Sequence, residues 1–257
     1  MKARLLKFTG VVRCLGSWLA SLLRARVSGA PLHLPAQEFM SDPVPRDFVF
    51  LASEWCEDQS AILLAFVWQG YDLLSTELPA GINLKDLERS ITQSLELRIR
   101  RVMTGDEPFD MQHSPRERET MKPSPAQPPE YDLAFVLRAE ERVMWPLEAK
   151  VLETDGAVRD YVEDIRNEFL TCRYAPFSSE SAMLAYLLSG TPENVFRNVT
   201  AKLPCSLEGH PRFPRRPHRV SKHQRPTKAG KVYPRDFRCH HLVLEFPGLT
   251  RGSDGAI

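Results

Sequence analysis

The chain has 257 residues, of which 42% are hydrophobic, and a formal net charge of +1. This length allows one large domain or a domain with extensions, and the hydrophobic content is sufficient for a folded core. No apolar run reaches the roughly 18 residues that a membrane span requires. The five cysteines are widely spaced and form no Cys-x-x-Cys pair, which argues against a disulfide framework and favours a reducing, cytoplasmic compartment.

Residues 1–45 are predicted to form a basic, α-helical N-terminal extension that ends in a linker. No acid occurs before Glu38, whereas six Lys and Arg residues precede it, and the stretch from Pro31 to Arg46 is rich in proline. The extension is a poor secretory signal, because Arg13 interrupts its apolar stretch. A surface helix, a disordered arm and an upstream extension of a protein that begins at Met40 are all left open.

Two helices are predicted before the main strands. The first covers about Glu57 to Leu78, with a buried apolar run from Ala61 to Trp68. The second covers about Leu84 to Met103, with Asn83 as its N-terminal cap. Its apolar stripe at helical spacing comprises Leu84, Ile91, Leu95, Ile99 and Val102.

Glu88 falls inside this apolar stripe, four residues after Leu84 and three before Ile91. A carboxylate directed at a core is unfavourable unless it is paired or binds a cation. Glu88 is therefore a candidate site residue. Taken alone, such an acid is more often a helix-edge residue paired with a nearby base, for which Arg89 and Arg98 are available.

Two apolar runs about a hairpin apart are predicted to be adjacent strands, Tyr131–Leu137 and Val143–Leu152. The first is apolar on both faces, as expected of a strand inside a sheet that is covered on both sides. Pro146 predicts a kink, a bulge or a local loss of pairing in the second. A short strand at Phe109–Met111 and a polar, Pro-rich loop from His113 to Glu130 precede them.

Helix and strand patterns alternate in the rest of the chain. An amphipathic helix is predicted around Tyr161–Phe169, and a short buried strand at Ala182–Leu188. Thr191 is expected to cap a further helix that has proline at its first position. A last strand is predicted at His241–Phe246, followed by a flexible tail over residues 247–257.

The segment from about residue 204 to residue 236 is predicted to be a basic, Pro-rich and weakly structured insertion. Between His210 and His240 there are ten Lys and Arg residues and one acid, Asp236. Such a segment suits the phosphates of a nucleic acid, and its affinity should then fall steeply with salt. A disordered solvated loop is the alternative. The candidate nucleic-acid-binding residues are Arg215, Arg216, Arg219, Lys222, Arg225, Lys228 and Lys231.

Acids and a lysine recur on the two predicted central strands. Asp132 lies near the start of the first, and Glu148 and Lys150 project from the same side of the second, because strand side chains alternate. Two carboxylates suit Mg²⁺ or Mn²⁺, with the carbonyl of Ala149 as a further ligand. The metal would activate a water, and Lys150 would orient that water and stabilise charge on a scissile phosphate. Taken singly, each residue is more often a strand-entry cap or part of a solvated face.

At these residues the chain resembles the PD-(D/E)XK nuclease superfamily, over roughly Leu84 to Phe246. The resemblance is carried by Glu88, by Asp132 in Glu-Tyr-Asp-Leu-Ala-Phe-Val, and by Glu148 and Lys150 in Pro-Leu-Glu-Ala-Lys-Val. It implies an α/β restriction-endonuclease-like core over residues 46–246, with a mixed central sheet flanked by helices. It also implies metal ligation by Asp132, Glu148 and Glu88, catalysis by Asp132, Glu148 and Lys150, and Mg²⁺-dependent cleavage of nucleic acid, more often DNA than RNA.

A non-catalytic subunit built on the same fold is the alternative interpretation. It would bind nucleic acid or assemble into a defence or repair complex, with the loop from His113 to Glu130 and the basic N-terminal arm as contacts. A homodimer or a larger complex is left open. A zinc module formed by C-terminal Cys and His residues is a distant third interpretation, because their spacings match no common pattern. The chain has no Gly-x-Ser-x-Gly elbow and no glycine-rich phosphate loop, which argues against a serine hydrolase or a nucleotide hydrolase.

Overall fold

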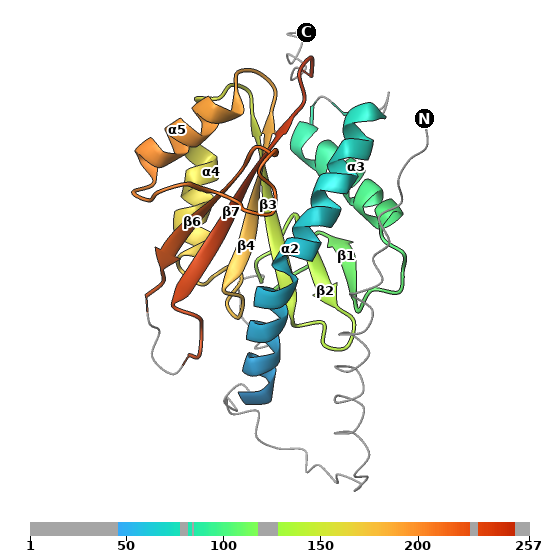
Figure 1. Ribbon diagram of the computed structural model, residues 1–257, viewed down its shortest axis with the longest axis vertical. Coiled ribbons are helices and arrows are strands. Elements are labelled where there is room, and N and C mark those ends of the chain that lie inside the picture. The colour runs from blue at the N-terminus through green and yellow to red at the C-terminus, as the bar shows by residue number, and fades with distance from the viewer. Residues whose placement is uncertain (1–45, 78–81, 84, 118–127, 227–230, 250–257) are drawn as a thin grey trace, which may run out of the picture. The chain divides into compact units, whose positions relative to one another are not determined.

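A mixed sheet organises the computed structural model of the chain (Figure 1). The structure describes residues 46–77, 82–83, 85–117, 128–226 and 231–249. Within these residues the sheet has seven strands in the order β1-β2-β3-β4-β7-β6-β5. The strands are β1 (Phe109–His113), β2 (Leu133–Leu137), β3 (Met144–Leu152), β4 (Glu180–Leu187), β5 (Glu208–Gly209), β6 (His218–Gln224) and β7 (Asp236–Glu245).

Parallel pairing is confined to the centre of the sheet. β4 lies parallel to both β3 and β7, whereas the pairs β1–β2, β2–β3, β5–β6 and β6–β7 are antiparallel. Every residue of β2 and β4 is buried. This confirms the expectation of central strands that are covered on both faces.

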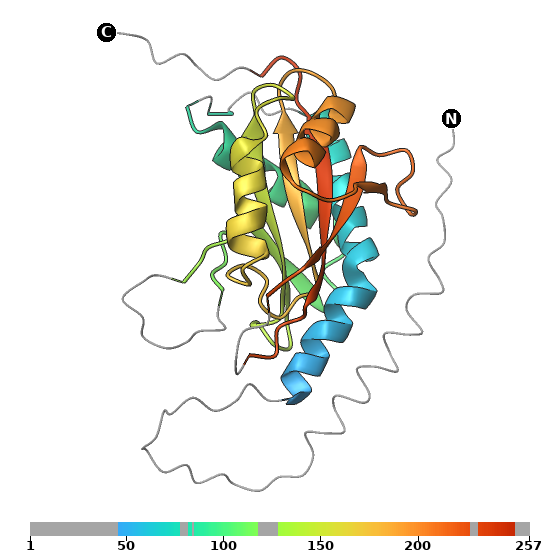
Figure 2. The same ribbon diagram turned by 90° about the vertical axis from the view of Figure 1, so that its left-hand side faces the viewer.

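Helices cover both faces of the sheet, and Figure 2 shows α2 and α4 on opposite sides of it. The helices are α2 (Arg46–Thr76), α3 (Leu87–Val102), α4 (Arg159–Asp164), the π-helix η1 (Ile165–Phe169) and α5 (Pro192–Lys202). Apolar residues of α2 and α3 form one core cluster with Leu147 and Ala149 of β3. Those of α4 and α5 form a second cluster, which includes Leu152.

The alternation of β3 side chains therefore decides where its polar residues lie. Leu147 and Ala149 face α2 and α3, so Glu148 and Lys150 share the other face with Leu152, on the side of α4. Pro146 stays in register with Ala134 of β2. The parallel ladder with β4 begins at the next residue, Leu147, so the local loss of pairing predicted for Pro146 is on the β4 side.

Several predicted helix boundaries are wrong. The first described helix begins at Arg46 and not near Glu57. The next begins at Leu87 with Asp86 in the cap position, while Asn83 Oδ1 accepts a hydrogen bond from the Lys85 N–H. The cap of α5 is confirmed, because the Thr191 hydroxyl accepts from the N–H of Asn194 at 3.3 Å, with Pro192 as the first helical residue.

The prediction of a weakly structured basic insertion is wrong for the stretch from His218 to Gln224. Strand β6 lies inside this segment and pairs with β7 from His218 to Gln224. His218 and Ser221 of this strand are polar but fully buried. A strand that buries polar side chains gives no alternation of hydrophobicity for sequence analysis to detect.

Some predictions concern residues that the structure does not describe. The N-terminal extension over residues 1–45 and most of the tail over residues 247–257 lie outside the described residues, as does Lys228. In the part of the chain that is described, no helix combines the length and the apolar character needed to cross a membrane.

Candidate active site

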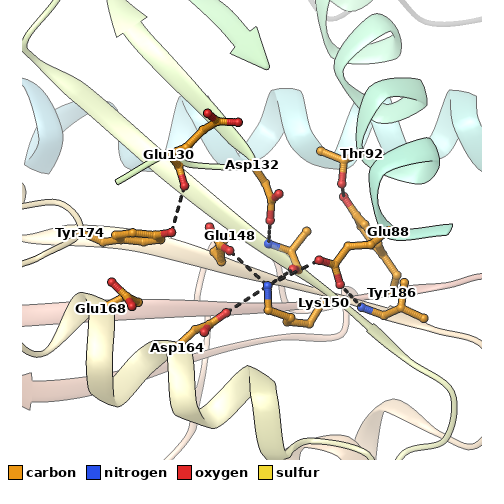
Figure 3. A network of polar contacts seen from close by, with 12 residues as sticks. Glu88, Thr92, Glu130, Asp132, Glu148, Lys150, Asp164, Glu168, Tyr174 and Tyr186 are labelled. Carbon is orange, nitrogen blue, oxygen red and sulfur yellow. Dashed lines mark hydrogen bonds and ion pairs between the residues drawn. The ribbon is translucent and has the colours of Figure 1, made fainter. Parts of the chain in front are cut away.

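One edge of β3 is not paired with β2 along its whole length. The β2–β3 pairing ends at Leu133 and Leu147, and β3 continues to Leu152. Beyond this point the N–H of Ala149 donates to Asp132 Oδ2 at 2.7 Å, and the N–H of Val151 donates to Glu88 Oε2 at 3.0 Å (Figure 3). Two acids predicted on separate elements are thus brought to the same stretch of backbone.

Lys150 lies among carboxylates from three elements. Its ammonium nitrogen is 3.0 Å from Asp164 Oδ2, 3.2 Å from Glu148 Oε1 and 3.5 Å from Glu88 Oε1. It also donates to the carbonyl of Ala149 at 3.0 Å. Burial alone would lower the pKa of Lys150, but the neighbouring carboxylates outweigh it and raise this pKa above its ordinary value. Lys150 therefore stays protonated at neutral pH.

Glu148 is the most deeply buried acid of this group, with 7% of its surface exposed. Its Oε2 atom is buried and has no hydrogen-bond partner among the described residues. Burial and then repulsion from Asp132 raise the pKa of Glu148 well above its ordinary value. Burial also raises the pKa of Asp132, although the N–H of Ala149 opposes the shift. Two carboxylates that are hard to ionise together therefore share one side of the site.

Glu88 is less buried than Glu148, and its carboxylate already contacts the N–H of Val151 and the ammonium of Lys150. Burial raises its pKa, and the charge of Lys150 and the N–H of Val151 oppose this shift. We call Glu88, Asp132, Glu148, Lys150 and Asp164 the acid–lysine cluster. Within the described part of the chain, no group of three or more His, Cys, Asp or Glu side chains is arranged to hold a metal ion. A three-acid centre that includes Glu88 is therefore not preassembled, and Glu88 contacts Lys150 instead.

Sequence reasoning missed Asp164, which ends α4 and makes the shortest carboxylate contact to Lys150. It also missed Tyr174, whose ring lies between Glu130 and Glu168 in Figure 3. The polar side of the amphipathic helix around Tyr161–Phe169 was the available signal for Asp164. Nothing in the sequence pattern indicates that this helix becomes the π-helix η1 after Asp164, a change that redirects the following residues.

The described members of the basic set predicted to bind nucleic acid do not gather at this site. β4 and β7 separate β6 from β3. Arg225 is 2% exposed, and its guanidinium donates to the carbonyls of Ala175 and Ser178, so it is not a surface residue. The others have varied surroundings: Arg215 and Lys231 are exposed, Arg216 pairs with Asp72, Lys222 pairs with Glu208, and Arg219 stacks on Phe196.

Comparison of the chain with protein-family models, with curated proteins and with solved structures finds no match. The acid–lysine cluster and its position in the sheet are therefore the basis for assigning a function.

Proposed function

We propose that the protein is a metal-dependent nuclease that hydrolyses phosphodiester bonds, of DNA in preference to RNA. One observation carries the proposal. Lys150 is held among Glu88, Glu148 and Asp164, beside a buried Glu148 oxygen that has no hydrogen-bond partner in the described structure. A buried carboxylate oxygen without a donor has the properties of a cation ligand, and a fixed ammonium suits the charge that develops on a phosphate.

The order of elements around the cluster supports the proposal. A helix (α3) precedes an antiparallel strand pair (β2 and β3), which is followed by a helix (α4) and a strand parallel to β3. The PD-(D/E)XK resemblance implies this order, with the acids at these positions. A restriction-endonuclease-like core is accordingly part of what we propose.

The residues present fit a Mg²⁺ or Mn²⁺ ion held mainly by Asp132 and Glu148. Mg²⁺ retains several waters and is commonly bound by one or two carboxylates together with substrate phosphates, so two acids suffice. When bound, the metal would lower the pKa of a water and offset the charge of the scissile phosphate. It would also relieve the repulsion that raises the pKa of Glu148 beside Asp132.

The surroundings of Lys150 limit its role. Since its pKa is raised above the ordinary value, the side chain stays an ammonium and does not act as a general base. We assign it to orienting the attacking water and stabilising negative charge on the phosphate. Asp164 and Glu88, which contact it from two helices, would fix its position for this role.

The test is cleavage of plasmid and single-stranded DNA by the full chain, with and without Mg²⁺ or Mn²⁺. We expect cleavage only with metal, its loss in Lys150→Ala, and its retention in Lys202→Ala, a matched change at an exposed lysine of α5. Asp132→Asn should abolish cleavage and leave DNA binding largely intact. Equal cleavage by wild type and a folded Lys150→Ala variant would contradict the proposal.

A non-catalytic binding or assembly subunit is the second candidate. The observation in its favour is that Lys150 already has three carboxylate neighbours and a carbonyl partner, so its charge is satisfied within the protein. Calorimetric titration of Mg²⁺ and Mn²⁺ in the presence of DNA separates the two candidates. Binding that Glu148→Gln removes supports the nuclease, and no binding by the wild type supports the second candidate.

A further inference from the structure

The segment after η1 has an unusual backbone. Cys172 and Ala175, neither of which is glycine, have φ angles of 59° and 49°. For residues with a Cβ atom, this left-handed conformation costs on the order of 1–3 kcal/mol and persists only where the surrounding structure enforces it. Such backbone strain is concentrated at functional sites, and Tyr174 lies between the two residues.

Hydrogen bonds hold this segment from both sides. The N–H groups of Arg173 and Tyr174 both donate to the carbonyl of Glu168, at 3.0 and 2.9 Å. The N–H of Ala175 donates to the hydroxyl of Tyr131 at 2.9 Å, and the carbonyl of Ala175 accepts from the buried Arg225. The structure thus fixes Tyr174 and its neighbours.

Tyr174 lies beside the acid–lysine cluster (Figure 3). Its hydroxyl donates to the carbonyl of Glu130 at 2.9 Å. Its pKa is raised, first by burial and then by the charges of Glu148, Glu168 and Asp164, so the hydroxyl stays protonated. Figure 3 shows Glu130 and Glu168 on different sides of the tyrosine, at the margin of the cluster.

Each of these marginal acids is paired with an arginine that faces solvent. The Arg173 guanidinium lies 2.5 Å from Glu168 Oε1, and its side chain is 55% exposed. Arg116 Nε lies 3.3 Å from Glu130 Oε2, and its side chain is 53% exposed. The Arg116–Glu130 pair is exposed on both sides, and such pairs contribute only about 0–1 kcal/mol. Glu168 is only 17% exposed and accepts two hydrogen bonds from Arg173 Nη1, so that pair is stronger. A guanidinium has five N–H donors, so Arg173 can bind a phosphate through Nε and Nη2 while it stays paired with Glu168.

We propose that Arg116 and Arg173 bind backbone phosphates of the nucleic-acid strand that enters the site, on the two sides of Tyr174. This inference rests on the proposed nuclease function and names its substrate contacts. The acids of the acid–lysine cluster would repel a polyanion, so cations at its margin are required to bring the strand in. Arginine suits this role because its planar guanidinium can bind a phosphate through two hydrogen bonds. Contacts of this kind carry no sequence information, so binding should not depend on base sequence.

The test is a binding measurement that does not require cleavage. Fluorescence anisotropy of a short labelled duplex is followed with the full chain in EDTA over about 0.05–0.3 M NaCl. Arg116→Ala and Arg173→Ala should each lower the slope of log affinity against log salt by about 0.9, and weaken binding at low salt by roughly 5- to 10-fold. Arg116→Lys and Arg173→Lys should restore most of the slope.

Matched controls remove an exposed arginine elsewhere. Arg159→Ala, at the start of α4, and Arg197→Ala, in α5, should leave the slope unchanged. The inference is overturned if wild type does not bind the duplex, or if it binds and the two alanine variants keep its slope. If both alanine variants weaken DNA binding but the wild type shows no Mg²⁺-dependent cleavage, the two arginines are confirmed as phosphate contacts. The nuclease proposal is then overturned instead.

Discussion

Two buried polar regions of this protein differ in how fully their groups are paired. The acid–lysine cluster at β3 contains a buried carboxylate oxygen without a hydrogen-bond partner in the described structure, and carboxylates that repel one another. The second region, which we call the histidine network, joins Trp68 of α2 to His218, His240, Glu180 and Arg238 in the sheet. In this network Glu180 Oε1 also lacks a hydrogen-bond partner among the described residues, but it is ion-paired with Arg238.

The hydrogen bonds of the histidine network have a single direction. The indole N–H of Trp68 can only donate, so His218 accepts at Nδ1, at 3.4 Å, and carries its proton on Nε2. His218 Nε2 then donates to His240 Nδ1 at 3.2 Å, and His240 Nε2 donates to Glu180 Oε2 at 3.1 Å. Glu180 also forms an ion pair with Arg238. Neutral histidines satisfy this chain, and burial lowers the pKa of His218 to about 2 and that of His240 to about 3.

Comparison of the acid–lysine cluster with the histidine network separates structural from functional polar residues. Both regions contain titratable groups that sequence reasoning regarded as candidate ligands. His218 and His240, which were candidates for zinc binding, are hydrogen-bonded to each other, whereas Glu148 and Asp132 at β3 repel one another in the absence of a cation or a proton. Repulsion between two buried carboxylates, and not a single unpaired atom or the density of charge in the sequence, therefore marks the candidate site.

The variant Glu148→Gln tests most directly whether the acid–lysine cluster is functional. If the carboxylate is functional and unfavourable in the apo protein, the substitution should reduce DNA cleavage by at least about 100-fold. It should also stabilise the fold by about 1 kcal/mol, because a buried and repelled charge is removed. Plasmid cleavage and urea denaturation measure the two effects. A loss of both activity and stability would place Glu148 with the structural groups.

The reciprocal change is His240→Leu in the histidine network. It leaves His218 Nε2 and one oxygen of Glu180 without their partner, and each unsatisfied buried group costs about 1–3 kcal/mol. We expect a loss of about 3 kcal/mol in the free energy of unfolding and unchanged cleavage by the remaining folded protein. His223→Ala, at a half-buried histidine, is the control and should cost less. Stability equal to wild type in His240→Leu would show that the network is dispensable.

The two regions should also respond to pH in opposite directions. His218, His240 and His241 have a folded-state pKa below the ordinary value of 6.5, so the unfolded chain binds protons first. Their stabilisation is present above about pH 6.5 and is lost on acidification, by about 1.4 kcal/mol per pH unit for each histidine. The raised pKa values of Glu148 and Asp132 have the reverse sign, since their contribution is lost as pH rises through the folded-state pKa.

This pH dependence is measured by urea denaturation of wild type and Glu148→Gln between about pH 5 and pH 8. Glu148→Gln should retain the acidic fall in stability and reduce the loss at higher pH. If the free energy of unfolding of wild type does not fall on acidification, the buried histidines are not held neutral in the folded state.

The smallest expected effect is that of Glu88→Gln. The amide oxygen can still accept from the N–H of Val151, but one negative charge near Lys150 is removed. We expect cleavage to fall by about tenfold or less, and stability to change by less than about 0.5 kcal/mol. Cleavage rates and thermal melting check both values. A loss as large as that of Glu148→Gln would instead make Glu88 a metal ligand.

The sequence allowed the central strands and most of the cluster to be predicted, because long apolar runs at Leu133–Leu137 and Met144–Leu152 leave few alternatives to buried strands. Glu88 was identified because an acid interrupted an apolar helical stripe. Strand β6 was missed because its buried positions include His218 and Ser221, which read as surface residues. Asp164 was missed because the polar side of its helix does not show that it faces Lys150 of β3, a contact set by tertiary packing.

The unpaired edge of β3 has a consequence for self-association. Free strand edges can recruit a strand from another molecule, and charged side chains at an edge hinder this. Asp132 and Glu88 occupy the two N–H groups of Ala149 and Val151 that such a strand would need. The carboxylates of Asp132 and Glu88 thus also hinder strand pairing between molecules at β3. Removing both at once should make the protein prone to oligomerise.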